Sequence, residues 1–212
     1  MASSQKKSSK IATYVFFDTE TTGLREDGHK PTITEMCFLA VRRSDLNSTE
    51  EVQRVVHKLL LCLKPRQEIQ KKAKELSGLS DNMLEVESTF DAGLATMIEL
   101  FLQRLPQPVC LVAHNGNQFH YSLLQAELRR VNASLPPAVL CVDSWEFFTG
   151  GTLKPGYKLA DIYENCFNRR PVTNRAESDC TNVLAVVKSR DTDFMKWSKL
   201  NAKRFQDVEP MY

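Results

Sequence analysis

Apolar residues occur along this chain in short, dense runs whose length is typical of buried strands. The first run extends from Ile11 to Phe17 and is rich in β-branched and aromatic side chains, which favour strands. Four later runs have the same character, and they lie at Thr32–Val41, Val55–Leu63, Val109–Ala113 and Val139–Val142. The pattern therefore predicts five strands.

Helical periodicity appears after the third run and then alternates with the later strands. Between Thr89 and Leu105, apolar residues recur at the spacing of one helix face. The other segments that predict helices are Glu68–Leu76, Tyr121–Val131, Leu159–Phe167, Ala176–Lys188 and Asp193–Phe205. Three consecutive strands followed by alternating strands and helices predict an α/β fold with a mixed five-stranded sheet flanked by helices. We expect its first three strands to be antiparallel, a single domain over residues 11–212 and a disordered leader over residues 1–10.

Composition is that of an ordinary globular protein and gives little guidance about partners. Hydrophobic residues make up 42% and charged residues 25% of the 212 residues, with a net charge of +2, which neither supports nor excludes nucleic-acid binding. None of the six cysteines lies in a C-x-x-C pair, which favours free thiols in a reducing compartment. The chain has no signal-peptide pattern and no apolar run of the roughly 18 residues that a membrane helix needs. We therefore expect an intracellular protein, cytoplasmic or nuclear, without a membrane segment.

The candidate chemistry begins where the first predicted strand ends. Asp18 and Glu20 are two positions apart, and side chains two apart on a strand share a face. Two carboxylates on a partly buried face repel each other, and a divalent cation relieves that cost; oxygen ligands suit Mg²⁺ or Mn²⁺. The following Thr21-Thr22-Gly23 sequence predicts a sharp turn. A D-x-E pair also occurs on solvated faces, but its position after a wholly apolar strand favours a metal site.

The segment FFDTETTGL (16–24) resembles the first motif of the DnaQ-like exonucleases, whose fold is ribonuclease H-like. Four further segments narrow the resemblance to the animal three-prime repair exonucleases: LVAHNGNQFHYSLLQAEL (111–128), CVDS (141–144), KELSGLS (74–80) and VEPMY (208–212). Similarity extends over nearly the whole chain, from Thr13 to Tyr212. The resemblance implies a fold that holds divalent metal against a nucleic-acid 3′ end.

The resemblance also implies roles for individual residues. Members of the family use four acidic residues, a histidine and two metal ions, which clamp the attacking water and the leaving oxygen. It assigns Asp18 to both metals, and Glu20 and Asp179 to the ion that activates water. Two family residues are replaced in this chain, because His120 stands at the third acidic position and Asn174 at the position of the histidine.

These two replacements predict a weakened site. Asn174 cannot accept a proton, so general-base assistance of about 10²–10⁴-fold is lost from that position. His120 is a poor ligand for Mg²⁺, so we expect one bound ion in place of two. Two interpretations of His120 remain, a relocated base or a side chain that packs or hydrogen-bonds where the aspartate stood, and we favour the second.

The features expected to contact nucleic acid are better preserved. Leu24, Leu76 and Phe119 would each more often belong to a core, but around an acidic site they indicate a stacking pocket for unpaired 3′ nucleotides. The residues that we expect to contact single-stranded DNA or other 3′ ends are Thr21, Thr22, Leu24, Leu76, His114, Phe119 and Lys154. A solvated lysine is an equally good interpretation of Lys154.

The third predicted strand, over residues 55–64, is apolar and would form an exposed sheet edge that is prone to pairing. In the family that the chain resembles, this edge pairs across a two-fold axis, so we expect a homodimer.

Three functions follow from these observations. The first is a protein that binds nucleic-acid 3′ ends and whose metal-dependent phosphodiester hydrolysis is weak or lost. The second is a fully active Mg²⁺- or Mn²⁺-dependent 3′→5′ DNA exonuclease, and the third is a non-catalytic dimeric scaffold or nucleic-acid sensor. His120 and Asn174 favour the first.

Overall fold

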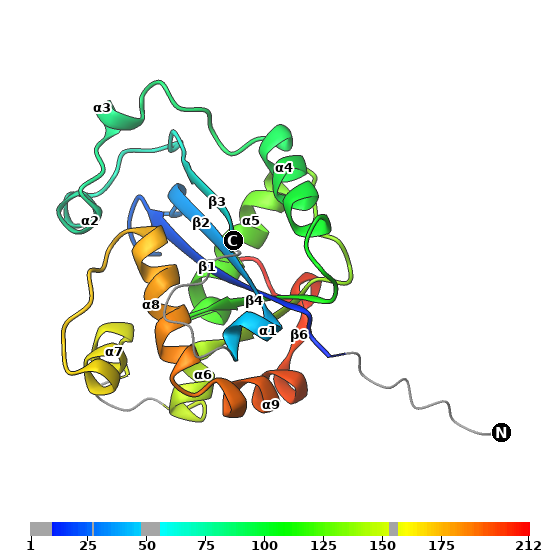
Figure 1. The fold of residues 1–212 in the computed structure, drawn as a ribbon. Coiled ribbons are helices and arrows are strands. Elements are labelled where there is room, and N and C mark those ends of the chain that lie inside the picture. Colours follow the sequence, from blue (N-terminus) through cyan, green and yellow to red (C-terminus); the bar gives the residue numbers. More distant parts are fainter. Residues whose placement is uncertain (1–9, 27, 48–55, 153–156) are drawn as a thin grey trace.

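The structure is a computed structural model that describes residues 10–26, 28–47, 56–152 and 157–212 (Figure 1). The predicted leader, apart from Lys10, and the expected contact from Lys154 lie outside the described residues. Among the described helices, none combines the length and the apolar character needed to cross a bilayer.

One mixed sheet forms the centre of the fold, with the strand order β3-β2-β1-β4-β5-β6. The described strands are β1 (Thr13–Thr21), β2 (Ile33–Arg42), β3 (Val56–Cys62), β4 (Val109–Ala113), β5 (Leu140–Asp143) and β6 (Lys203–Arg204). The first three strands pair antiparallel, whereas β4 pairs parallel with β1 and β5 pairs parallel with β4. This arrangement confirms the α/β class and the predicted strand directions.

The described sheet has six strands, so the predicted number of five is wrong by one short strand. The sequence predicts a final helix that continues to Phe205, but α9 (Asp191–Asn201) ends four residues earlier. Lys203 and Arg204 then pair antiparallel with β5. Both residues are exposed and charged, so they carry none of the apolar alternation from which strands are predicted.

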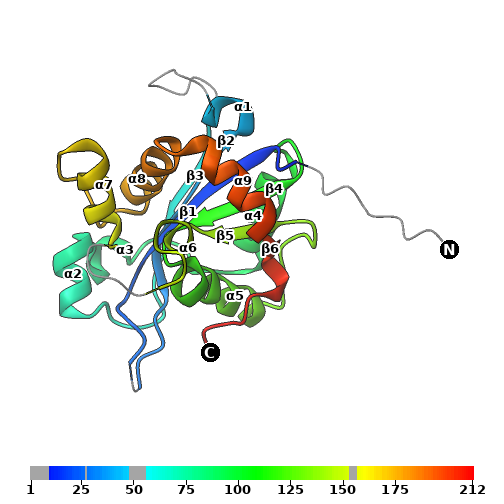
Figure 2. The same cartoon turned by 90° about the horizontal axis from the view of Figure 1, so that it is seen from below.

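Helices cover both faces of the sheet, and Figure 2 shows α8 and α9 on one side and α5 on the other. The described helices are α1 (Arg43–Leu46), α2 (Lys71–Ser77), α3 (Asp81–Leu84), α4 (Ala92–Gln103), the π-helix η1 (Gly116–His120), α5 (Tyr121–Arg130), α6 (Ser144–Thr149), α7 (Leu159–Phe167), α8 (Ala176–Lys188), α9 (Asp191–Asn201) and the 3₁₀-helix η2 (Phe205–Asp207). The elements α1, α3, α6, η1 and η2 do not appear in the sequence prediction, because they are too short to develop a helical periodicity.

The central strand β1 is buried on both faces, and its alternation divides the core into two layers. Val15 and Phe17 pack against the α4–α5 side, whereas Tyr14 and Phe16 pack against the α8–α9 side. The same period of two places Asp18 and Glu20 on the α8–α9 side at the end of the strand. The apolar pattern of β1 thus decides which helix faces its carboxylates.

Candidate active site

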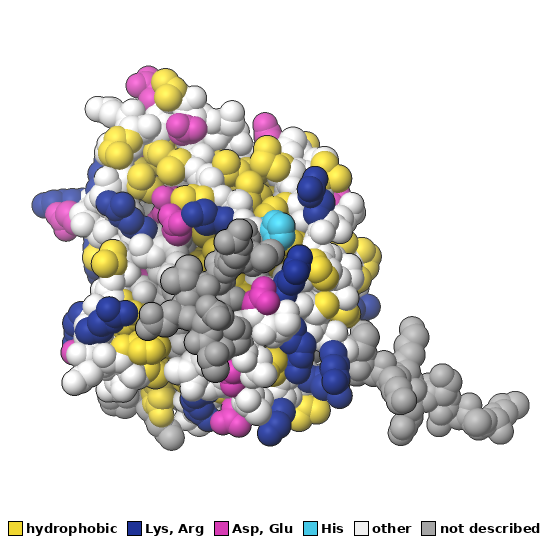
Figure 3. Space-filling model, viewed as in Figure 1, with side chains coloured by type: hydrophobic (Ala, Val, Ile, Leu, Met, Phe, Trp, Pro, Cys, Tyr) yellow, Lys and Arg dark blue, Asp and Glu magenta, His cyan; other side chains and the backbone are white. Residues whose placement is uncertain are grey.

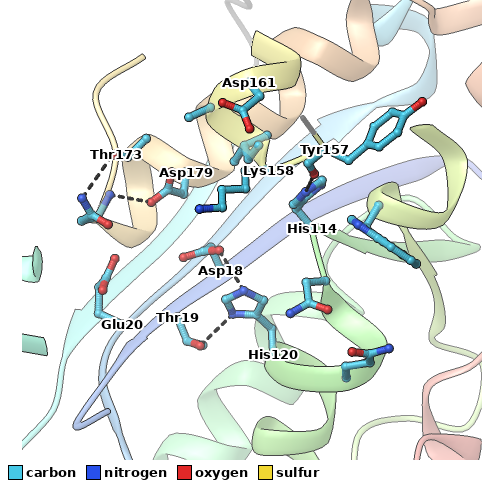
Figure 4. A pocket seen from close by; sticks show the side chains of 16 residues that line it. Asp18, Thr19, Glu20, His114, His120, Tyr157, Lys158, Asp161, Thr173 and Asp179 are labelled. Atoms are coloured by element: carbon cyan, nitrogen blue, oxygen red, sulfur yellow. Dashed lines mark hydrogen bonds and ion pairs between the residues drawn. The ribbon is translucent and has the colours of Figure 1, made fainter. Parts of the chain in front are cut away.

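Three carboxylates from two elements converge where β1 ends (Figure 4). Asp18 and Glu20 come from β1, and Asp179 comes from the first turn of α8. One oxygen atom of each carboxylate lies within 4.8 Å of the other two. One cation with oxygen ligands can contact three atoms that are this close together.

The electrostatics of this acidic cluster favour a bound cation. Burial raises the pKa of the Asp18 carboxyl well above its usual range, and the charges of Asp179 and Glu20 raise it further. Burial and repulsion from Asp179 and Glu35 raise the pKa of Glu20 to about 7. Burial also raises the pKa of Asp179, although hydrogen bonds to it act in the opposite direction. A divalent cation removes the cost of ionising such a group, and its hard oxygen ligands fit Mg²⁺ or Mn²⁺.

Hydrogen bonds at the start of α8 hold Asp179 in place. Its Oδ2 atom accepts a hydrogen bond from the backbone N–H of Asn174 at 2.8 Å. The Ala176 N–H donates to Oε2 of Glu35 at 2.7 Å, which ties the helix to β2. Glu35 lies opposite Glu20 in the antiparallel pair of β1 and β2. Glu35 is not among the residues that we predict from the sequence. The signal that could have identified it is a carboxylate inside an apolar strand.

His120 ends the π-helix η1 and lies beside the acidic cluster (Figure 4). Its Nε2 atom lies 3.3 Å from Oδ1 of Asp18, and its Nδ1 atom lies 2.9 Å from Oγ1 of Thr19. Burial, followed by repulsion from His114, lowers the pKa of His120 to about 3, so the ring is neutral at physiological pH. Both ring nitrogens therefore face protein partners.

Asn174 adopts a left-handed backbone conformation, with a φ of 63°, just before α8. Asparagine tolerates this region better than most residues. Its side-chain amide donates to Oγ1 of Thr173 at 3.1 Å, whereas its backbone N–H supports Asp179. Asn174 therefore acts on the acidic cluster through its backbone and offers no basic side chain.

Two adjoining hollows meet at the cluster. The larger, here called the acidic hollow, has a volume of about 710 Å³. The smaller, here called the apolar groove, has a volume of about 310 Å³. Thr19, Glu20 and Asn174 line both hollows, so a strand that occupies one can continue into the other.

The apolar groove brings together the three expected stacking residues from separate elements. Leu24 follows β1, Leu76 lies on α2 and Phe119 lies on η1, and all three line the groove. Leu24 is 58% exposed and Leu76 is 54% exposed, so both offer apolar surface to a ligand in the groove. Gly23 shapes the turn before Leu24, because its φ is 151° and a Cβ atom there would collide with the side chain of Gln70.

The other expected contact residues differ in their access to the hollows. Thr21 lines the apolar groove, and its hydroxyl donates to the Gly23 carbonyl at 2.8 Å. Thr22 has no exposed surface, and its hydroxyl accepts a hydrogen bond from the Thr32 N–H at 3.1 Å, so it supports the turn from inside. His114 lines the acidic hollow, and burial lowers its pKa to about 4.

The sequence interpretation also missed Asp143, at the end of β5. Its carboxylate accepts backbone hydrogen bonds from Asn115 at 2.9 Å and from Asn117 and Trp145 at 3.0 Å. These bonds fix the start of η1, which carries Phe119 and therefore one wall of the apolar groove. The signal for Asp143 was its position directly after an apolar strand.

Known exonucleases are similar to this chain over most of its length. The sequence model of the exonuclease family, RNase_T, matches residues 15–187. Three-prime repair exonuclease 1 of Bos taurus is 36% identical over 225 residues, covering 95% of this chain and 71% of the relative. Three prime repair exonuclease 2 of Homo sapiens is 34% identical over 223 residues, covering 96% of this chain and 94% of the relative.

Solved structures show the same fold. A 3′-exonuclease described for 3′-end specific recognition of a histone mRNA stem-loop has a TM-score of 0.67 at 15% identity, covering 90% of this chain and 67% of that chain. The nuclease domain of 3′hExo, a DEDDh family member bound to rAMP, has a TM-score of 0.65 at 12% identity. The match covers 87% of this chain and 94% of that chain.

The fold and the acidic cluster define a protein of the DnaQ-like exonuclease class. The chain belongs to the exonuclease family and, within it, to the three-prime repair exonucleases.

Replacing Asp143 should loosen the wall of the site. In an Asp143→Asn variant, one acceptor oxygen is lost while three backbone N–H groups still require partners. We expect the free energy of unfolding to fall by about 1–3 kcal/mol, measured by urea denaturation. The matched control is Asp193→Asn, an exposed residue of α9 that should change the stability by less than about 0.5 kcal/mol. Equal losses in the two variants would contradict the anchoring role.

Proposed function

We propose that this protein binds the 3′ ends of nucleic acid, single-stranded DNA above all, and that it hydrolyses phosphodiester bonds weakly or not at all. The observation that carries the proposal is the engaged ring of His120 beside Asp18. We treat residues 11–212 as one exonuclease-like unit. All six cysteines are free thiols, which supports an intracellular location.

The acidic cluster supports one divalent cation, Mg²⁺ or Mn²⁺, with Asp18, Glu20 and Asp179 as its ligands. When bound, such an ion supplies positive charge for a phosphodiester and acidifies a coordinated water. A second ion beside Asp18 would have to take imidazole in place of a carboxylate, which is a poor exchange for Mg²⁺.

Proton transfer is the step that the chain's own residues support least. His114 uses Nδ1 with Ser144 and Nε2 with the Tyr157 carbonyl, each at 3.1 Å. His120 has both ring nitrogens engaged, and Asn174 carries an amide. Among the described residues that line the acidic hollow, no histidine therefore offers a free nitrogen to an attacking water.

Binding of a 3′ end is supported by the apolar groove. Leu24, Leu76 and Phe119 offer apolar surfaces next to the carboxylates. Stacking of a base on an aromatic side chain such as Phe119 contributes about 1–3 kcal/mol and tolerates any sequence, and the two leucines add apolar surface beside it. We therefore place the 3′-terminal base in the groove and the adjoining linkage over the acidic hollow.

An active exonuclease is the second candidate function. Its support is the retained set of three carboxylates and the membership of the exonuclease family. Activity would then depend on an ion at Asp18, Glu20 and Asp179 and on a base other than Asn174.

A digestion and binding experiment separates these functions. We expect a 5′-labelled single-stranded oligonucleotide to bind in Ca²⁺, measured by fluorescence anisotropy, and to be shortened slowly or not at all in Mg²⁺ or Mn²⁺. Rapid shortening that disappears in Asp18→Ala would establish the active enzyme. Absence of binding to any 3′-ended oligonucleotide would favour a scaffold that does not use the groove.

Restoring the two family residues should restore hydrolysis. The double variant His120→Asp with Asn174→His regains a carboxylate beside Asp18 and a general base, so we expect a gain of about 10²–10⁴-fold in the rate of shortening. Single variants serve as controls and should gain less, because the two groups act on one step. No gain in a folded double variant would mean that other residues also limit the reaction.

We further propose a homodimer that pairs through the edge of β3. Leu59, Leu60 and Leu61 are only half-buried there, and Figure 3 shows hydrophobic side chains gathered over β3 and α4. Leu60→Glu should convert the dimer to a monomer in light scattering, because a charge at a pairing edge is costly. Leu200→Glu, at an α9 position that is 82% exposed, should leave the mass unchanged. A monomeric wild-type chain would contradict the proposal.

A further inference from the structure

The acidic side chains that line the acidic hollow outnumber the basic ones, and a bound cation keeps those that hold it ionised. Four carboxylates line it, those of Asp18, Glu20, Asp161 and Asp179. Asp161 faces Arg170 at 3.7 Å, but the other three converge on one another. A phosphodiester in the hollow adds a further negative charge. One divalent cation balances only part of this sum, so a strand needs another positive group.

Lys158 supplies the one lysine or arginine side chain among the described residues that line the hollow. Figure 4 shows this side chain extending from the start of α7 into the hollow, toward Asp18 and Asp179. Lys158 is exposed, and it forms no ion pair with any described carboxylate. Its ammonium group therefore remains available to a ligand.

The backbone around Lys158 is held over the hollow by two sets of hydrogen bonds. The Lys158 carbonyl accepts from the N–H groups of Asp161 and Ile162, each at 3.0 Å, which fixes it at the first turn of α7. The preceding Tyr157 carbonyl lies 3.1 Å from Nε2 of His114, which follows β4. Because a carbonyl can only accept, Nε2 is the protonated nitrogen of that ring. The lysine is thus anchored to the central sheet.

The histidines do not compete for this role. His114 is engaged at Ser144 and Tyr157, and His120 is engaged at Asp18 and Thr19. Both rings therefore act inside the protein, and among the described residues that line the hollow the Lys158 ammonium is the positively charged donor that remains for an anionic oxygen.

We propose that Lys158 binds the phosphodiester that joins the 3′-terminal nucleotide to the rest of the strand. This inference rests on the proposed binding of 3′ ends and names the group that receives the phosphate. The positive charge of the Lys158 ammonium takes the place of a second metal ion beside the phosphate. It does so without a metal, so the contact should persist in the presence of a chelator.

A charge-deletion cycle tests the contact on both partners. Oligonucleotides with a natural linkage or an uncharged methylphosphonate at the 3′-terminal linkage are titrated with wild-type chain and with Lys158→Gln in EDTA, by anisotropy. For the wild-type chain we expect about fivefold to tenfold weaker binding to the methylphosphonate, since one charge-assisted contact is lost. Lys158→Gln should bind the natural oligonucleotide equally weakly and should be insensitive to the methylphosphonate. Its slope of log affinity against log salt should fall by about 0.7.

Three controls fix the site and the chemistry. Lys158→Arg keeps the charge and should retain most of the affinity. Lys199→Gln removes a charge from α9, away from both hollows, and should keep the full methylphosphonate penalty. A methylphosphonate at the third linkage from the 3′ end should weaken wild type and Lys158→Gln equally. Thermal unfolding of each variant verifies that it is folded.

The outcomes distinguish this inference from the function on which it rests. If Lys158→Gln binds and suffers the same terminal methylphosphonate penalty as wild type, Lys158 does not contact that linkage and the inference fails, while 3′-end binding stands. If Lys158→Gln instead loses its sensitivity to a methylphosphonate at the third linkage, Lys158 contacts that phosphate and not the 3′-terminal one. If the wild-type chain binds no oligonucleotide, both the inference and the proposed function fail.

Discussion

Mutual repulsion among carboxylates at the end of the central strand is the constraint on which this site depends. Asp18, Glu20 and Asp179 lie within 4.8 Å of one another through one oxygen each, and Glu35 faces Glu20 from the next strand. Each is held by packing or by hydrogen bonds that the rest of the fold provides. The sheet and α8 therefore hold these carboxylates close together despite their repulsion, and a bound cation can relieve that repulsion.

His120 and Asn174, which the sequence resemblance marks as replacements, would change this constraint in different ways. His120 places a neutral ring beside Asp18, where a carboxylate would have added to the repulsion. Asn174 offers no basic side chain, and its backbone N–H donates a hydrogen bond to Asp179. The contacts of His120 and Asn174 are compatible with the exonuclease fold, so the proposed loss of hydrolysis would not require a loss of the fold.

The sequence predicts the elements and residues that belong to a hydrophobic period or a motif. It does not predict those that form only through packing between distant segments. The dense apolar run before Asp18 predicts β1 and the shared face of Asp18 and Glu20, and the order of strands and helices along the chain predicts the α/β class. It does not predict β6, because Lys203 and Arg204 become a strand only by pairing with β5. Lys158 has no local signal either, since its importance comes from the absence of other cations in the described hollow. Contacts between distant segments are invisible to local patterns.

The parallel pairing of β1 with β4 also has a consequence for the order of events during folding. It joins Thr13 to Val109, residues 109 − 13 = 96 positions apart, and Asp179 comes later still. Long-range pairings of this kind form slowly, because a large loop must close before they contribute stability. Asp179 consequently remains far from Asp18 and Glu20, which are neighbours on β1, in an incomplete or partly folded chain. The repulsion between Asp179 and the other two arises only when α8 docks, and the same docking buries apolar residues of α8 that oppose it, among them Cys180 and Val183.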